Sequence, residues 1–265
     1  MAKLPFQVKP FIIGMVHVGP LPGTPLYKGN FDEIVKNAIR DARTLEEGGV
    51  DGIIIENFND KIYRIGRADP AVTSSMTLIV NEVRKEVSIP IGINVLRDCV
   101  LDSLAIAYVT KSSFIRVNAL VETIDAPEGI LKPSAYKLNM YRSVLRAWNI
   151  AILADIHVKH GKPLTGRDID VVAREAIERG LADAVIITGR ITGEAIDLND
   201  LIRVKKVVNT PIIIGSGLNP DNAKELLRYA DGAIVGTYFK ANGRVSIEKV
   251  RRFMNVIKEL RRKFD

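Results

Sequence analysis

The residues best suited to chemistry stand together at positions 153–160, which read Leu-Ala-Asp-Ile-His-Val-Lys-His. Side chains along a β-strand alternate between its two faces. In a strand that runs as far as Lys159, the side chains of Asp155, His157 and Lys159 share one face, and the other face is wholly apolar. Packing alone rarely places an acid, an imidazole and an amine side by side, so the pattern predicts an active site.

Two kinds of reaction fit these side chains. His157 can act as a general acid and base that Asp155 orients, while Lys159 stabilises a developing oxyanion. Alternatively, Lys159 forms a Schiff base with a sugar carbonyl, after burial and nearby Arg116 have lowered its pKa. His160 falls on the opposite face of the strand, and we interpret it as a loop residue rather than a partner in the reaction.

A divalent metal ion is a third alternative. His157 and Asp155 would bind it, with Glu56 or His17 as a further ligand. Because these ligands come from separate segments and would have to converge, we rank the metal last and predict no other cofactor. The single cysteine, Cys99, excludes paired cysteine ligands and an intramolecular disulfide.

The elements that must position these residues follow from an eightfold alternation of apolar runs and amphipathic stretches. Eight strand–helix units in about 250 residues predict an α/β fold, a single closed (β/α)8 TIM barrel that forms one domain over residues 1–265. An open doubly wound sheet would have fewer strands and a glycine fingerprint after the first one, which this chain lacks. The predicted strands are 11–17, 51–57, 89–96, 114–120, 150–159, 182–189, 211–217 and 231–237, and the predicted helices are 32–48, 73–87, 99–110, 134–148, 167–180, 197–208, 220–229 and 246–263.

In such barrels the active site lies at the carboxyl ends of the strands. Other predicted strands also end in polar residues there, and charged side chains inside a barrel must be paired or bind a ligand. A self-satisfied network, such as Asp155 with Arg116, is the structural alternative, but clustering at one end of several strands favours a ligand site. The predicted catalytic residues are therefore Asp155, His157, Lys159, Arg116, Asn118, Glu56 and His17, and the predicted substrate-binding residues are Asn57, Asn94, Thr188 and Arg190.

Two connections that follow predicted strands, 18–31 and 121–133, are longer than a simple turn requires. Their prolines and glycines predict shaped turns or lids over the barrel mouth, with rigid surface loops as the alternative.

Glycines follow both the seventh and the eighth predicted strands. They let backbone N–H groups approach an anion closely, and hydroxyl side chains beside them add donors. One Gly-Ser-Gly sequence is a weak signal, but a pair at these two strand ends predicts a site for phosphate. The predicted phosphate-binding residues are Gly215, Ser216, Gly217, Gly236 and Thr237.

The net charge of +7 permits an anionic partner without naming one. Basic residues crowd the last predicted helix, and we interpret them as its solvated face, with a membrane-surface patch as the alternative. No nucleic-acid-binding motif appears, so we predict no nucleic-acid partner. The short, mixed start of the chain does not resemble a signal peptide. We expect a cytoplasmic homo-oligomer, and the scarcity of glutamine hints at a thermophilic source.

Several segments resemble the BtpA family, the photosystem I biogenesis proteins and their prokaryotic relatives. The resemblance runs nearly end to end. The resemblance implies a TIM barrel. The family takes its name from a role in stabilising a membrane photosystem in cyanobacteria, but the resemblance does not imply a particular reaction. The matching segments are 11–23 (FIIGMVHVGPLPG), 51–60 (DGIIIENFND), 115–120 (IRVNAL), 155–160 (DIHVKH), 215–220 (GSGLNP) and 236–240 (GTYFK).

The sequence therefore predicts a lyase, isomerase or aldolase that acts on a small phosphorylated, sugar-like substrate. The phosphate is expected at the seventh and eighth strand ends, and the reacting carbons near Lys159 across the mouth. The rival interpretation is a non-enzymatic assembly factor that docks peripherally on membranes through the basic last helix.

Overall fold

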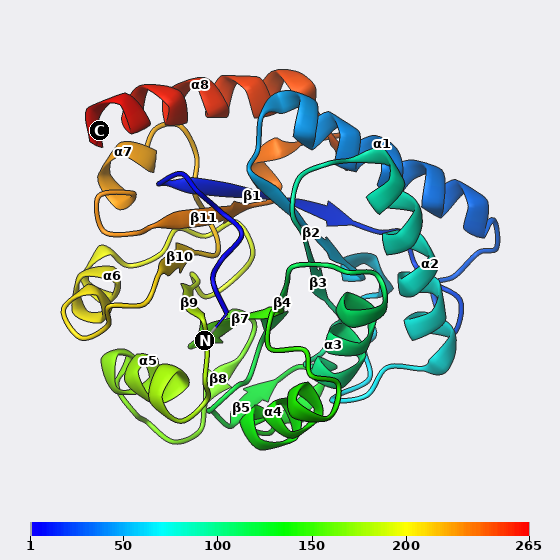
Figure 1. Ribbon diagram of the computed structural model, residues 1–265, viewed down its shortest axis with the longest axis horizontal. Helices are drawn as coiled ribbons and strands as arrows, with labels where there is room; N and C mark the ends of the chain where they lie inside the picture. Colours follow the sequence, from blue (N-terminus) through cyan, green and yellow to red (C-terminus); the bar gives the residue numbers. More distant parts are fainter. Residues whose placement is uncertain (1, 265) are drawn as a thin grey trace.

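The computed structural model describes residues 2–264, without the side chains of Lys263 and Phe264. Eight parallel strands of this part of the chain close into a barrel, with each strand hydrogen-bonded to its neighbours and β11 returning to β1 (Figure 1). The predicted TIM barrel is confirmed. The barrel strands are β1 (Phe11–His17), β2 (Gly52–Glu56), β3 (Ile91–Asn94), β4 (Phe114–Val117), β7 (Ala151–Ile156), β9 (Ala184–Ile187), β10 (Ile212–Ile214) and β11 (Gly232–Val235).

Helices surround the barrel as an outer ring (Figure 1). The second begins three residues before its predicted start, because Asp69 caps it by accepting a hydrogen bond from the Ala71 N–H and Pro70 suits its first turn. The seventh is only four residues long, shorter than predicted. The ring contains α1 (Phe31–Gly48), α2 (Pro70–Glu86), α3 (Val100–Val109), α4 (Ala135–Val144), α5 (Ile169–Glu178), α6 (Leu198–Lys205), α7 (Ala223–Leu226) and α8 (Ile247–Phe264).

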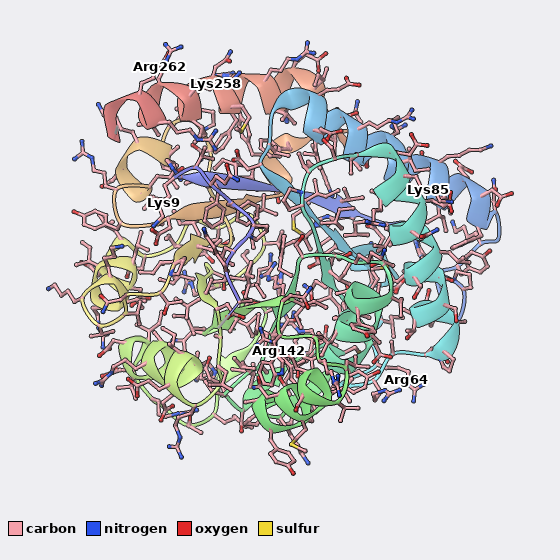
Figure 2. All side chains as sticks on the ribbon, viewed as in Figure 1. Lys9, Arg64, Lys85, Arg142, Lys258 and Arg262 are labelled. Atoms are coloured by element: carbon pink, nitrogen blue, oxygen red, sulfur yellow. The ribbon has the colours of Figure 1, made fainter. Side chains whose placement is uncertain are left out.

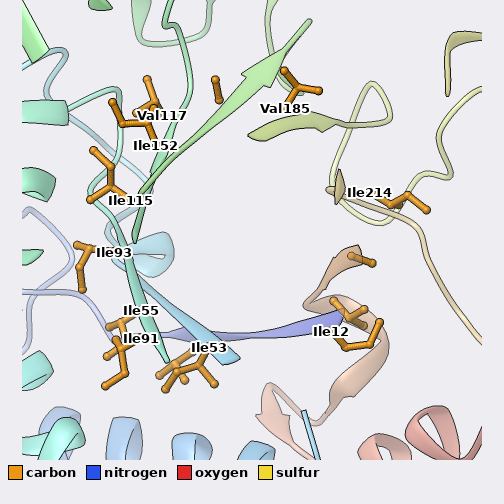
Figure 3. Packing of buried hydrophobic residues seen from close by; sticks show 14 of the residues in the cluster. Ile12, Ile53, Ile55, Ile91, Ile93, Ile115, Val117, Ile152, Val185 and Ile214 are labelled. Atoms are coloured by element: carbon orange, nitrogen blue, oxygen red, sulfur yellow. The ribbon is translucent and has the colours of Figure 1, made fainter. Parts of the chain in front are cut away.

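Most strand residues on both faces are apolar, because both faces of the barrel strands are buried. Outward side chains such as Ile12, Ile53 and Ile152 pack in the layer between strands and helices (Figure 3). Inward side chains form a separate cluster that fills the floor of the barrel, with Phe11 and Phe114 among them. Above this floor the inward positions become polar, so the barrel has a packed apolar base and a polar mouth.

The amino-terminal segment closes the floor of the barrel. Its dark blue trace crosses the barrel end that faces the viewer in Figure 1. The ring of Phe6 stacks on Phe11 with 4.3 Å between centroids, and it meets Phe114 edge-on at 5.7 Å. Ligands therefore have access to the barrel from the opposite end.

The two long connections have different structures. In the 18–31 connection, the Asp60 carboxylate accepts a hydrogen bond from the Leu21 N–H at 2.8 Å, which anchors the loop. The 121–133 connection instead contains two short strands, β5 (Ile124–Ala126) and β6 (Gly129–Leu131), which form a hairpin. β5 also pairs with β8 (Lys162–Pro163), a further strand after β7. The polar mouth is thus flanked by a small three-stranded sheet that the sequence did not predict.

The basic residues of α8 are not all equivalent. Arg261 bonds the Pro10 carbonyl oxygen at 2.8 Å and ion-pairs with Asp51, so it has a structural role. Lys258 and Arg262 project from the outer edge of the molecule (Figure 2). The side chain of Lys263, part of the predicted basic face, lies outside the described residues. Among residues 2–264 no helix combines the length and apolarity needed to cross a bilayer.

Candidate active site

Asp155 lies at the centre of a buried network above the barrel floor. Arg116 donates to its carboxylate from Nε at 3.1 Å and from Nη2 at 3.0 Å, and Asn118 Nδ2 donates at 2.8 Å. Burial opposes the charge on Arg116, but the carboxylates of Asp155 and Glu56 raise its pKa above the ordinary value. The Asp155 carboxylate is therefore fully engaged by Arg116 and Asn118, and it orients these two side chains rather than His157.

Lys159 is a lysine of the polar mouth. Its partly buried side chain lines two adjacent cavities, together with Glu56 and Arg116. Burial, reinforced by the positive charge of Arg116, lowers the pKa of Lys159 to about 8. A substantial fraction of this amine is consequently neutral near pH 7 to 8, which is the form that attacks a carbonyl carbon.

A chain of three side chains leads from Glu56 to the barrel rim. His17 Nε2 lies 3.6 Å from Glu56 Oε1, and Lys240 Nζ contacts His17 Nδ1. Burial first, and then the charge of Lys240, keeps the pKa of His17 well below its ordinary value. His17 is thus a neutral imidazole. Because Nδ1 accepts from Lys240, the proton resides on Nε2 and faces Glu56.

Lys240 had no role in the sequence-based prediction. It belongs to a short strand, β12 (Lys240–Ala241), which follows the last barrel strand after a 3-10 turn, η2 (Thr237–Phe239). Burial lowers its pKa to about 8 as well. The only sequence signal was its place at the end of the segment 236–240 that resembles the family.

The first cavity, which we call the glycine cavity, has a volume of about 200 Å³. All the predicted phosphate-binding residues line it. The backbone of Gly217 has φ +69°, and a Cβ there would lie 2.4 Å from the Ala195 backbone, so only glycine fits. Within the described residues the N–H groups of Gly217, Gly236 and Thr237 donate to no protein acceptor. They are available to an anion.

Ser216 lines the glycine cavity, but its hydroxyl is already engaged. Its Oγ accepts a hydrogen bond from the Gly189 N–H at 2.7 Å and donates to the Glu194 carbonyl oxygen at 2.9 Å. This side chain therefore holds the 189–194 loop against the cavity. Among the described residues, the backbone N–H groups named above are unengaged donors of the cavity.

The second cavity, which we call the hairpin cavity, has a volume of about 250 Å³ and lies beside the β5–β6 hairpin. His160 joins the rims of the two cavities, since its Nε2 lies 2.8 Å from Oγ1 of Thr192 in the glycine cavity wall. The residues that line the hairpin cavity are Glu56, Phe58, Lys61, Tyr63, Asn94, Leu96, Arg97, Arg116, Asn118, Pro127, Glu128, Lys159 and His160.

A sequence model described as the BtpA family matches residues 8–259. The chain belongs to the BtpA family. It is 43% identical to an uncharacterized protein of Thermococcus kodakarensis over 260 aligned residues. The alignment covers 97% of this chain and 98% of that relative. It is 41% identical to the photosystem I biogenesis protein BtpA of Synechocystis over 242 aligned residues. This alignment covers 91% of this chain and 84% of that protein.

Solved structures show where this BtpA-family chain stands among known folds. N-(5'-phosphoribosyl)anthranilate isomerase from Pyrococcus furiosus superimposes with a TM-score of 0.60 at 13% identity, which covers 94% of this chain and 99% of that one. Thiamine phosphate pyrophosphorylase from Pyrococcus furiosus superimposes with a TM-score of 0.59 at 18% identity and 96% coverage of both chains. At these identities the likeness establishes the shared barrel fold.

In this BtpA-family barrel, His157 does not share a face with Asp155 and Lys159. The prediction that the strand extends to Lys159 was wrong, because β7 ends at Ile156 and His157 has a left-handed φ of 50°. The Glu122 carboxylate accepts the His157 N–H at 2.8 Å. The imidazole turns toward the carbonyl oxygen of Arg167, at 3.1 Å, and lines neither cavity.

The four predicted substrate-binding residues occupy different places. Asn94 lines the hairpin cavity and donates to Glu56. Asn57 instead bridges the buried Asp60 carboxylate and the Leu96 N–H, so it is part of the scaffold. Thr188 and Arg190 lie outside both cavities. The Thr188 hydroxyl donates to the His157 carbonyl oxygen at 3.4 Å, and Arg190 is exposed and forms an ion pair with Glu194.

The ligand set proposed for a divalent metal does not converge. Asp155 is bound to Arg116 and Asn118, while His157 lies outside the mouth. Within the part of the chain that the structure describes, no three His, Cys, Asp or Glu side chains gather in a way that could hold a metal ion.

Proposed function

We propose that this protein is an enzyme that binds a small phosphorylated carbonyl compound and attacks it with Lys159 to form a Schiff base. The observation that carries the proposal is the position of Lys159. Its amine has a pKa of about 8 and lies in the wall shared by both cavities, beside glycines whose N–H groups are free to bind an anion.

The phosphate is bound in the glycine cavity by the N–H groups of Gly217, Gly236 and Thr237. The names of two fold neighbours, thiamine phosphate pyrophosphorylase and phosphoribosylanthranilate isomerase, describe phosphorylated compounds, which agrees with this assignment. The shared fold is compatible with such ligands, and the argument for this chain rests on its own glycine cavity.

In the chemical step, the neutral Lys159 amine attacks the carbonyl carbon, and a carbon–nitrogen bond forms as the oxygen takes up a proton. Loss of water from the carbinolamine, with one further proton, leaves a protonated imine. Glu56 lines the same cavities and is the group that carries protons, with the neutral His17 behind it. The imine then accepts electrons from an adjacent C–C or C–H bond, as lyase, aldolase or isomerase chemistry requires.

Borohydride trapping tests the covalent step. The protein is incubated with glyceraldehyde 3-phosphate or dihydroxyacetone phosphate, reduced, and mapped by peptide mass spectrometry. A stoichiometric adduct on Lys159 that disappears in Lys159→Met supports the proposal. The exposed neighbour Lys162 supplies the control, since Lys162→Met should leave the adduct in place. Adducts scattered over exposed lysines, with none on Lys159, would overturn it.

Titration calorimetry with inorganic phosphate tests the anion site. Thr237→Glu places a negative charge beside the anion and should lower its affinity by at least tenfold. The matched variant Thr237→Val keeps the backbone N–H and should lose only a few-fold. Equal affinities of Thr237→Glu and the unchanged protein would place phosphate elsewhere.

A second candidate function is assembly or docking at a membrane surface. It is favoured by the exposed Arg251, Arg252 and Arg262 on α8 and by the name of the Synechocystis relative. Sedimentation with anionic vesicles tests it. Binding that is lost when these three arginines become glutamates supports docking, whereas no pelleting at physiological salt contradicts it. Arg261 is left unchanged because its ion pair with Asp51 is structural.

A further inference from the structure

Three residues that line the hairpin cavity have buried polar atoms that make no hydrogen bond within the described part of the chain. Among the described residues, five buried side-chain atoms lack a hydrogen bond, and three of them, Asn118 Oδ1, Arg97 Nε and Glu128 Oε2, belong to residues that line this cavity. Asn118 is 2% exposed and Arg97 is 5% exposed. An unpaired buried polar atom is costly, so such a concentration indicates a site that a ligand completes.

Neither Asn118 nor Arg97 can easily turn its unpaired atom elsewhere. Asn118 Nδ2 donates to the Asp155 carboxylate at 2.8 Å, which directs Oδ1 away from that acid. Arg97 Nη2 donates to the Lys159 carbonyl oxygen at 2.8 Å, which fixes the guanidinium. Arg97 Nε and Glu128 Oε2 form a long ion pair at 3.8 Å, and this distance is too great for a hydrogen bond between them.

The free atoms have a definite hydrogen-bonding pattern. Asn118 Oδ1 and Glu128 Oε2 accept, and Arg97 Nε donates. A group that carries an N–H next to a carbonyl or ring nitrogen satisfies Glu128 and Arg97 together. The side chains of Phe58, Tyr63, Leu96 and Pro127 supply apolar, mostly flat walls around them. This combination of flat apolar walls and a few fixed polar atoms suits a planar nitrogen heterocycle.

The two cavities adjoin at the reactive centre, because Glu56, Arg116 and Lys159 line both of them. A ligand that occupies both cavities therefore passes beside the Lys159 amine. We propose that the substrate is a phosphate ester joined to a planar nitrogen heterocycle through a sugar-sized spacer. The spacer carries the carbonyl group that Lys159 attacks, and the heterocycle is bound in the hairpin cavity. This inference rests on the proposed function, because the phosphate end and the reacting carbon beside Lys159 are those assigned above.

Calorimetric titration with four kinds of probe tests the heterocycle subsite. The probes are inorganic phosphate, ribose 5-phosphate, the nucleoside 5'-monophosphates of the four common bases, and the corresponding nucleosides. At least one nucleotide should bind ten times more tightly than ribose 5-phosphate, because only the nucleotide fills both cavities. Saturation with this nucleotide should also block imine trapping at Lys159.

A matched pair of variants in the same hairpin locates the effect. Glu128→Ala removes the acceptor in the cavity and should lower the preference for the nucleotide over ribose 5-phosphate by at least fivefold, while ribose 5-phosphate binds as before. Asp125→Ala removes an exposed carboxylate from β5 and should leave the preference intact. An equal loss in both variants would mean a general electrostatic effect and would overturn the subsite.

The possible failures are distinguishable. If phosphate and ribose 5-phosphate bind in the glycine cavity but no nucleotide binds more tightly, the heterocycle subsite is wrong and the proposed function stands. If no phosphate ester binds and Lys159 forms no imine, the proposed function is wrong and the two-ended substrate falls with it, whether or not nucleosides bind.

Discussion

Lys240 Nζ contacts Nδ1 of His17, although 223 positions separate the two residues in sequence. The contact fixes the tautomer of a buried imidazole and directs its Nε2 proton toward Glu56. The ring of Phe58 stacks on His17 at 4.4 Å between centroids and holds it in the barrel wall. Glu56 is the carboxylate that lines both cavities. Behind it lie the neutral imidazole of His17 and the partly buried amine of Lys240.

The first prediction concerns this contact. Burial lowers the pKa of His17 most, and the positive charge of Lys240 lowers it further. Lys240→Met removes that charge, so the pKa of His17 should rise toward its ordinary value. NMR titration can follow it directly, because the chain has only three histidines. Lys36→Met, on the exposed side of α1, is the control. An unchanged His17 titration in Lys240→Met would contradict the assignment.

The second prediction concerns the stability cost of Lys159. Its pKa of about 8 lies below the unfolded value near 10.4, so the fold disfavours the charged amine. The cost is full below pH 8 and disappears as the pH rises through the unfolded pKa. Lys159→Met should therefore raise the free energy of unfolding by roughly 2 kcal/mol at pH 7 and by much less at pH 10, as measured by guanidinium denaturation. A destabilised variant at pH 7 would contradict this view.

The third prediction separates His157 from Lys159. His157 lies outside both cavities, and asparagine tolerates its left-handed backbone. His157→Asn should therefore keep the borohydride-trapped adduct within about twofold of the unchanged protein, whereas Lys159→Met abolishes it. If His157→Asn loses the adduct while its melting temperature is unchanged, His157 takes part in the reaction and the acid–base alternative is favoured.

The fourth prediction concerns the buried pair of Arg116 and Asp155. Arg116→Met leaves the Asp155 carboxylate without its counter-charge, which should cost about 3–5 kcal/mol of unfolding free energy. The double variant Arg116→Met with Asp155→Leu removes both charges and should recover at least half of that loss. A double-mutant cycle in guanidinium measures the coupling. Additive losses would show that the pair is not coupled.

The sequence predicted the barrel and most of its mouth because the relevant signals are local. Alternation fixes which strand residues point inward, and in a parallel barrel all strands end at the same side. This placed Glu56, Arg116 and Asp155 in one layer and placed Gly217 and Gly236 in one cavity, as found. The ligand set suggested for a metal does not converge in the structure, because Arg116 engages Asp155. Alternation along a strand shows which way a side chain points but not which side chain it meets.

The tertiary structure alone decided the rest. β7 ends at Ile156, before the predicted end of the strand. Glu122, in the connection between β4 and β5, accepts a hydrogen bond from the His157 N–H, and the chain turns at His157. Lys240 meets His17 because β11 pairs with β1 and closes the barrel, which brings the two ends of the chain together. The hairpin beside the second cavity depends on pairing between β5 and β8. Local sequence determined which strand residues face the mouth, whereas long-range hydrogen bonds determined which of them meet, because those bonds join segments that no local pattern connects.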